Sequence, residues 1–282
     1  AYNSASTLRA AIDCLLNQSF RDFELIVSDN ASTDETWSII QEYADRDSRV
    51  VGLRQPHNIG ANGNYTAVFC ASTGRYFKWA SSNDWCAPGF LASCVEHLEA
   101  NPDVAMVGPR TRLFFETPTD ARDYPSDISL EDTNPVERFI RLSQTLALNN
   151  VMNGLVRKEI LDSTRLIEHY PGADIVLVGH IALLGKIGLL PDYLFYRRMD
   201  SETATAMMDE AARQRHHYPS KTSRSLFPTW RFMAGLFRAV CSAKLSGSDT
   251  LRAMEWVFRM GYWRQLDLRK DLMNAFRYAM RG

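Results

Sequence analysis

The residues best suited to chemistry lie where a run of apolar residues ends in a cluster of oxygen-bearing side chains. Phe77 to Trp79 read as a strand, Asn83 and Asp84 follow it, and Pro88 comes four residues later. Carboxylate and amide oxygens are the ligands that Mg²⁺ prefers, and one or two of them suffice when phosphate oxygens and water complete the shell. The pattern predicts a site for a divalent cation and a nucleotide. An Asx-turn without any ligand is the alternative interpretation.

The composition is that of an ordinary globular protein. The chain has 282 residues, of which 45% are hydrophobic and 23% charged, enough for one large α/β domain or a domain with an appendage. A net charge of −1 argues against a nucleic-acid partner, which would require a basic excess on one face. The five cysteines form no CxxC pair, so reduced thiols in a cytoplasmic protein are expected rather than a disulfide framework or a zinc site.

Helices and strands alternate in the first part of the sequence. Apolar spacing and polar breaks predict helices over 6–16, 35–47 and 90–100, a loop followed by a helix over 58–71, and strands over 23–27, 50–54, 77–79 and 104–107. Such alternation builds a parallel sheet covered by helices, and ligands bind at the carboxyl ends of its strands. The polar clusters after Val27, Arg54 and Trp79 all fall at that edge, so we expect them to form one site.

The second part of the chain is less regular. Residues 116–134 are rich in Pro, Asp, Ser and Thr and predict a surface loop or lid. A helix is expected over 135–148, a strand over 152–157, an apolar helix over 175–184 and a strand over 188–197. From about residue 209 onward, helix-forming residues mixed with Arg and aromatic side chains predict a helical C-terminal region.

With these loops in place, the chain resembles family 2 glycosyltransferases of the GT-A fold, which transfer sugars from nucleotide-sugar donors. The resemblance covers roughly residues 2–199 and rests on six motifs in order. They are Tyr2-Asn3, Asn17-Gln18-Ser19, the loop 28–34, Asn58-Ile59-Gly60 with Asn64, Asn83-Asp84 with Pro88, and Asp174 before an apolar helix.

The resemblance implies an α/β architecture with a Rossmann-like, mostly parallel sheet flanked by helices. It implies a GT-A domain over 1–205, with a nucleotide half at about 1–110 and an acceptor half at about 111–205, followed by a helical C-terminal region over 206–282. It also implies an apolar strand before Tyr2. Because the given sequence begins at Ala1, about ten residues of a strand and its lead-in are expected to be missing.

The same resemblance implies where the donor nucleotide binds. Asp29 would accept a hydrogen bond from the base of a uridine-type nucleotide, for which a carboxylate is suited because it pairs with an imide N–H. Tyr2 and Asn3 would line the base pocket, and Asn58 and Gly60 would lie near the nucleotide. The alternatives are an Asx-turn or helix cap at Asp29 and an ordinary turn at Gly60.

The metal motif departs from the family's usual Asp-x-Asp-Asp. The four positions here are Ser81, Ser82, Asn83 and Asp84, so a single carboxylate remains. By the resemblance, Asp84 and Asn83 would be the ligands of Mn²⁺ or Mg²⁺. Because so few charged ligands hold a cation weakly, we expect the metal to bind appreciably only together with the nucleotide diphosphate.

Asp174 resembles the family's general base, although Ala173 precedes it where relatives often carry Glu. The alternative is that Asp174 only caps the following helix. Arg197 and Arg198 resemble residues near the diphosphate, which a guanidinium can bind bidentately, and surface salt bridges are their alternative. Asp200 stands where many relatives have His, which argues against a third metal ligand there.

The expected function is transfer of a sugar, with inversion, from a UDP-sugar to a glycan or lipid-linked acceptor in cell-surface polysaccharide synthesis. A non-catalytic relative is the main alternative, because the acidic cluster is depleted. A nucleotidyltransferase is a weaker alternative, since the Gly-rich basic loop of that class is missing after Asn3.

In the C-terminal region, Arg residues lie beside bulky aromatic residues. This mixture indicates peripheral contact with the inner face of the membrane. The alternative is that the helices pack on the sheet or on a second subunit of a homo-oligomer.

Overall fold

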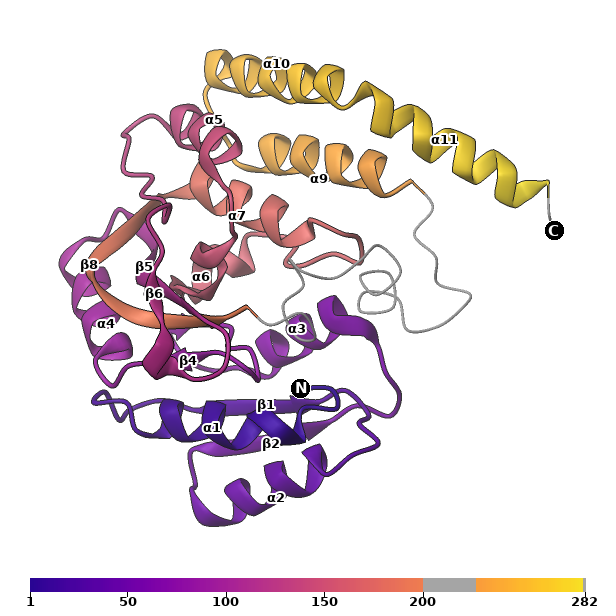
Figure 1. The fold of residues 1–282 in the computed structure, drawn as a ribbon. Helices are drawn as coiled ribbons and strands as arrows, with labels where there is room; N and C mark the ends of the chain where they lie inside the picture. The colour runs from indigo at the N-terminus through magenta and orange to yellow at the C-terminus, as the bar shows by residue number, and fades with distance from the viewer. Residues whose placement is uncertain (200–226, 281–282) are drawn as a thin grey trace.

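The alternation of helices and strands that the sequence predicts is present in a computed structural model, which describes residues 1–199 and 227–280 (Figure 1). The first half contains α1 (Ala5–Leu16), β1 (Leu25–Asp29), α2 (Thr36–Arg46), β2 (Val50–Arg54), α3 (Gly60–Ala71), β3 (Tyr76–Phe77), β4 (Trp85–Cys86), α4 (Phe90–Ala100) and β5 (Val104–Phe114). The rest contains η1 (Pro118–Asp120), β6 (Arg122–Asp123), α5 (Pro135–Thr145), η2 (Asn150–Asn153), β7 (Leu155–Arg157), α6 (Lys158–Asp162), α7 (Ala173–Leu184), β8 (Lys186–Arg198), α9 (Pro228–Ser242), α10 (Gly247–Trp263) and α11 (Gln265–Ala279).

A small parallel sheet forms the N-terminal part. Strands β1 and β2 pair in parallel, and α1 and α2 bury their apolar faces against them in a core that includes Leu8, Ile12, Ile40 and Val27. The start of α1 is capped from a distance, because the Asp34 carboxylate accepts the backbone N–H of Ala5 at 3.1 Å. The nucleotide-binding loop predicted after β1 is thereby fastened to the first helix.

The larger sheet is mixed, where the sequence predicts mostly parallel pairing. Its strand order is β3-β7-β5-β8-β4, with β6 on the other part of β5. The long strands β5 and β8 run parallel and curve across the molecule (Figure 1), whereas the short strands all pair antiparallel. Of these short strands, β6 returns along β5 without an intervening α-helix, and antiparallel pairing needs no helical crossover.

The strand expected up to Trp79 ends at Phe77. Trp79 turns inward instead: its indole N–H donates to the Tyr65 carbonyl at 3.0 Å, and its ring packs against Phe69 and Phe77. The chain from Lys78 to Asp84 is therefore free of sheet pairing and crosses the edge of the sheet as an irregular segment. That segment carries the Asn83-Asp84 motif.

Helices α9–α11 make up the described part of the predicted C-terminal region. Helix α9 packs on α7, and α10 covers α9 and α5, so that α10 and α11 form the outermost layer (Figure 1). Phe232, Leu236 and Val257 belong to the same buried core as the residues of the larger sheet.

The predicted domain boundary at 205/206 and Asp200 lie outside the described residues. Among the described helices, none combines the length and apolar character needed to cross a bilayer.

Candidate active site

A cleft of about 960 Å³ lies between the small sheet and the C-terminal helices. Its walls come from the N-terminus, the segment after β3, the start of α7, the end of β8 and the helices α9 and α10. Of the residues predicted from the sequence, those lining the cleft are Tyr2, Asn3, Asn83, Asp84, Asp174, Arg197 and Arg198. The predicted residues Asp29, Asn58 and Gly60 lie behind the wall.

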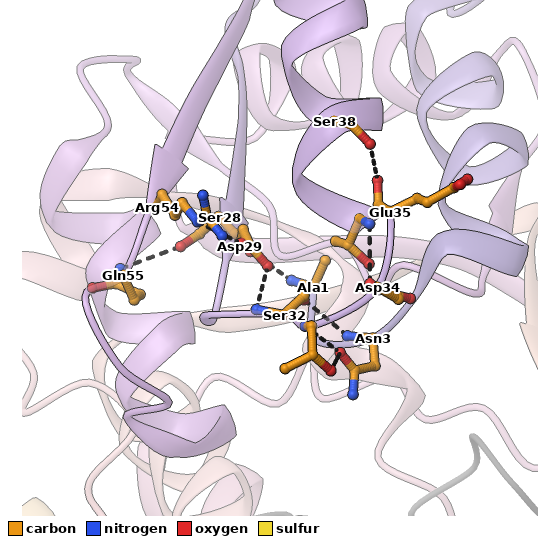
Figure 2. A network of polar contacts seen from close by, with 12 residues as sticks. Ala1, Asn3, Ser28, Asp29, Ser32, Asp34, Glu35, Ser38, Arg54 and Gln55 are labelled. Atoms are coloured by element: carbon orange, nitrogen blue, oxygen red, sulfur yellow. Dashed lines mark hydrogen bonds and ion pairs between the residues drawn. The ribbon is translucent and has the colours of Figure 1, made fainter.

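Asp29 is completely buried at the end of β1 (Figure 2). Its Oδ1 accepts the backbone N–H of Ser32 at 3.0 Å, so this oxygen closes the loop as the turn alternative predicts. Its Oδ2 has no hydrogen-bond partner, although Arg54 Nε lies 3.3 Å away as an ion-pair contact. A buried carboxylate oxygen without a donor is unfavourable, so Oδ2 has an acceptor position available for a ligand N–H.

Asn3 holds the nucleotide loop against the N-terminus. Its backbone N–H donates to Ser32 Oγ at 2.9 Å, and its side-chain Oδ1 accepts the Thr33 N–H at 2.9 Å. Asn3 has a φ of +48°, a conformation that Asn adopts more readily than most residues. The beginning of the chain and the loop after β1 therefore form one hydrogen-bonded unit at the cleft (Figure 2).

Asn58 and Gly60 shape the loop before α3. Asn58 Oδ1 accepts both Asn30 Nδ2 and the Gly60 N–H, each at 2.9 Å, and Asn30 Oδ1 accepts the Ile59 N–H. Gly60 has a φ of +77°, which favours glycine. Asn30 itself lines the cleft, so the sequence analysis missed a cleft residue that the polar break after β1 contains.

Asp84 lies beside the end of β8. Its Oδ1 accepts the backbone N–H of Arg198 at 2.9 Å. Burial raises the pKa of the Asp84 carboxyl above its ordinary value, and this hydrogen bond and the nearby charges of Arg197 and Lys78 partly oppose that shift. Ser82 Oγ donates to Ser4 Oγ at 3.0 Å, which ties the segment to the start of α1.

Few side chains near Asp84 can bind a metal ion. Within residues 1–199 and 227–280, no three His, Cys, Asp or Glu side chains come together as a metal site. Asp84 offers one carboxylate and Asn83 one amide carbonyl, both on the cleft wall. Hard oxygen ligands of this kind fit Mg²⁺ or Mn²⁺ when a diphosphate and water supply the remaining positions. The residues present therefore fit a cation that arrives with a nucleotide diphosphate.

Asp174 lies within the first turn of α7, after Gly172 at the N-cap. It is not the capping residue that the alternative interpretation predicts. Its Oδ2 accepts Asn149 Nδ2 at 2.8 Å, while the buried Asn149 Oδ1 has no hydrogen-bond partner among the described residues. Asn149 is a second residue that the sequence analysis missed, because it belongs to none of the motifs.

Arg197 and Arg198 bring positive charge to the cleft. Arg197 Nη1 donates to Asn150 Oδ1 at 2.8 Å, which fixes the guanidinium near Asp84. Arg198 contributes its backbone N–H to Asp84. A third arginine, Arg264 between α10 and α11, also lines the cleft and was not predicted. A cleft with two carboxylates on opposite sides and three guanidinium groups suits a ligand that carries phosphate.

Comparison with known proteins identifies the family. Residues 1–164, more than half of the chain, match the model of glycosyl transferase family 2. An Escherichia coli protein named UDP-Glc:alpha-D-GlcNAc-diphosphoundecaprenol beta-1,3-glucosyltransferase WfaP is 29% identical over 99 residues, or 35% of this chain and 39% of that protein. A Campylobacter jejuni protein named GalNAc(5)-diNAcBac-PP-undecaprenol beta-1,3-glucosyltransferase is 32% identical over 107 residues, or 38% and 34%. The chain thus spans less than half the length of these two relatives.

Solved structures share the fold. Residues 1–349 of S. aureus TarS, in complex with UDP-GlcNAc, superpose with a TM-score of 0.66 at 17% identity, covering 94% of this chain and 72% of that one. The mannosyltransferase PcManGT from Pyrobaculum calidifontis, in complex with GDP-Man and Mn²⁺, gives 0.55 at 16% identity, covering 99% and 78%. These likenesses confirm the GT-A architecture expected from the sequence. Together with the match over residues 1–164, they place the chain in glycosyl transferase family 2.

Proposed function

We propose that the protein transfers a sugar from a UDP-sugar to a hydroxyl group of a glycan or lipid-linked acceptor, with inversion at the anomeric carbon. The observation that carries this proposal is the placement of Asp84 and Asp174. They are the two carboxylates among the described lining residues of one cleft, and they come from different walls. One carboxylate for a cation at the diphosphate and one for the acceptor proton are what such a displacement requires.

On the donor side, the nucleotide occupies the wall built by the N-terminus and the loop after β1. The half-exposed Tyr2 ring offers a surface for the base, and Asp29, although buried behind the wall, is the carboxylate that would accept the imide N–H of uracil. Asp84 and Asn83 would hold Mn²⁺ or Mg²⁺, which would supply positive charge for the diphosphate. Arg197 and Arg198 add further positive charge beside it.

On the acceptor side, Asp174 is the general base. The acceptor oxygen attacks the anomeric carbon, its proton passes to Asp174, and the bond from that carbon to the diphosphate breaks to release UDP. A single displacement of this kind inverts the configuration. Asn149 is a positioning residue, because its amide holds Asp174 Oδ2 and leaves Oδ1 for the acceptor proton.

A lipid-linked acceptor is favoured by the names of two relatives, which specify diphosphoundecaprenol and PP-undecaprenol acceptors. Such an acceptor would place the protein peripherally on the inner face of a membrane, in synthesis of a cell-surface polysaccharide. In this proposal the protein is cytoplasmic and meets its acceptor at the membrane surface.

Calorimetry with UDP, GDP, CDP and dTDP, each with and without Mn²⁺, tests the proposal. We expect UDP to bind at least tenfold more tightly with Mn²⁺ than without it, and Mn²⁺ alone to bind weakly. Preference for another nucleotide would overturn the assignment of UDP. Binding of none of the four would overturn the assignment as a transferase. It would favour the non-catalytic alternative, which is suggested by the depleted acidic motif.

A further inference from the structure

The outermost helices carry an apolar face that points away from the protein. Six large apolar side chains on α10 and α11 are each 55–74% exposed: Leu251, Phe258, Tyr262, Leu266, Met273 and Phe276. Spacings of seven and four residues on α10, and of seven and three on α11, keep each set on one side of its helix. Soluble monomers seldom expose a contiguous row of this kind, so the face indicates a binding surface.

The opposite side of the two helices is fixed to the protein. Ala253 and Val257 of α10 are buried in the core. On α11, the buried Asp271 carboxylate accepts the Thr229 N–H at 2.7 Å, and Trp230 Nε1 donates to the Leu268 carbonyl at 3.1 Å. These contacts with α9 set the rotation of the helices about their axes. The outward direction of the apolar face is therefore built into the fold.

The C-terminal helices are basic, although the whole chain has a net charge of −1. Residues 227–280 contain nine Lys and Arg against four Asp and Glu, so the remainder of the chain is acidic. Of the four acids, Asp271 is buried and Glu255 is paired with Arg259 at 2.7 Å. Arg269, Lys270 and Arg277 of α11 are all exposed. A basic, amphipathic layer matches an anionic lipid surface.

The cleft opens next to this face. Arg264 lies between α10 and α11, and it lines the cleft together with Thr229 and Phe232 of α9. Its guanidinium stands over the Phe232 ring at 4.7 Å. Two residues before Arg264 and two after it, Tyr262 and Leu266 belong to the apolar face. The chain therefore passes from the apolar face into the cleft wall within one helical turn.

We propose that the apolar face of α10 and α11 rests in the surface of an anionic lipid bilayer, and that Arg264 binds the phosphate of a membrane-embedded acceptor at the edge of the cleft. The part about the acceptor rests on the proposed function. The bilayer is favoured over a second copy of the chain, because two such faces would bring like charges together. In this position the hydrophobic chain of the acceptor stays in the bilayer while its head group enters the cleft.

Flotation of the full chain with phosphatidylglycerol vesicles tests the membrane face. The variant Phe258→Ser/Leu266→Ser/Phe276→Ser removes apolar side chains without touching the core, and Val51→Ser/Phe115→Ser removes exposed apolar side chains elsewhere. We expect the unaltered chain and the second variant to float, and the first variant to bind at least tenfold less. Binding of the unaltered chain to phosphatidylcholine vesicles, or at high salt, should fall by a similar factor.

Three results would contradict the proposed contact of α10 and α11 with the membrane. They are failure of the unaltered chain to float, equal flotation of the Phe258/Leu266/Phe276 variant, and light scattering that shows a dimer which this variant dissociates. Metal-dependent UDP binding, measured on every variant, reports on folding and on the proposed function separately. Flotation without UDP binding would overturn the proposed function alone, and UDP binding without flotation would overturn the membrane face alone.

Arg264→Gln tests the head-group site. The probe is geranylgeranyl diphosphate in phosphatidylcholine vesicles, with Arg231→Gln as the control, because Arg231 is exposed on α9 outside the cleft lining. We expect Arg264→Gln to bind the probe about tenfold more weakly while UDP binding and flotation on anionic vesicles are unchanged. Equal probe binding by Arg264→Gln and the unaltered chain would remove Arg264 from the proposal.

Discussion

The two walls of the cleft are held in place in different ways. At and behind the donor wall, Asp29 and Asn58 accept backbone N–H groups of their own loops, and Asn3 accepts one from the loop after β1. On the acceptor wall, Asn149 meets Asp174, and Arg264 meets Phe232, across packed helices. The geometry of the donor wall is therefore set by local hydrogen bonds, and that of the acceptor wall by tertiary packing. Changes in the C-terminal helices should alter acceptor use and leave donor binding intact.

Loss of the donor-side carboxylate should have the largest effect. In Asp84→Ala, we expect the affinity for UDP in the presence of Mn²⁺ to fall on the order of 100-fold, because the charged metal ligand is gone. Calorimetry with and without Mn²⁺ measures this. Asp192→Ala, at an exposed position of β8, is the control and should bind normally. An Asp84→Ala protein that retains Mn²⁺-dependent binding would break the assignment of the donor wall.

The substitution Asn149→Ala should affect the acceptor wall and leave the donor wall unchanged. Loss of the amide that holds Asp174 should lower turnover about tenfold, the effect of one hydrogen bond to a charged group, and leave UDP binding unchanged. UDP release from a UDP-sugar, with water as the acceptor, provides the rate. Asn101→Ala, at the end of α4 and outside the cleft lining, is the matched control. If Asn149→Ala weakened UDP binding as strongly as turnover, the division between the walls would fail.

The conformation of Gly172 tests how packing supports the acceptor wall. Its φ is +82°, and an added Cβ would lie 3.1 Å from Phe232 Cδ2. Gly172→Ala should therefore lower the free energy of unfolding by about 1–3 kcal/mol, measured by urea denaturation. Gly247→Ala, in the first turn of α10, is the control, because an added Cβ meets nothing within 4 Å there, and it should not lower the free energy of unfolding. Equal effects would show that the contact with α9 is unimportant.

A pH dependence should mark the junction of α7 and α9. Burial lowers the pKa of His180 below its ordinary value of 6.5, and its Nε2 lies 3.1 Å from Ser242 Oγ. The unfolded chain then binds a proton at a pH where the folded chain does not, so stability falls as the pH drops below about 6.5. Relative to His180→Gln, the unaltered protein should lose up to about 1.4 kcal/mol per pH unit in that range.

Denaturation curves between pH 5 and 7.5 measure this slope, with His57→Gln, an exposed position, as the control. The His57→Gln protein should keep the pH dependence of the unaltered chain. A His180→Gln protein with the same pH dependence would contradict the account of this junction.

The donor wall was largely predictable from the sequence, because its residues occur in contiguous motifs at strand ends. Tyr2, Asn3, Asn83 and Asp84 reach the cleft as expected, whereas the completely buried Asp29 does not line it. The family and the GT-A fold followed from the same motifs. The mixed pairing of the larger sheet did not, since short strands such as β3 have too few residues to show a pattern.

The acceptor wall was predictable only at Asp174. Asn149 and Arg264 reach the cleft through the packing of α7, α9 and α10, and no spacing along the chain shows which helices touch. The exposed row on α10 and α11 is visible in the sequence as aromatic residues among arginines. Its outward direction depends on the contacts of Asp271 and Leu268, which are long-range.

The most direct test of the account measures UDP binding and UDP release from a UDP-sugar in Asp174→Asn. The account predicts Mn²⁺-dependent UDP binding within twofold of the unaltered protein, and a rate of release lower by about 10²–10⁴-fold, because the base is lost and the donor wall is intact. An unchanged rate would remove Asp174 from the mechanism. A parallel loss of UDP binding would contradict the assignment of separate donor and acceptor walls.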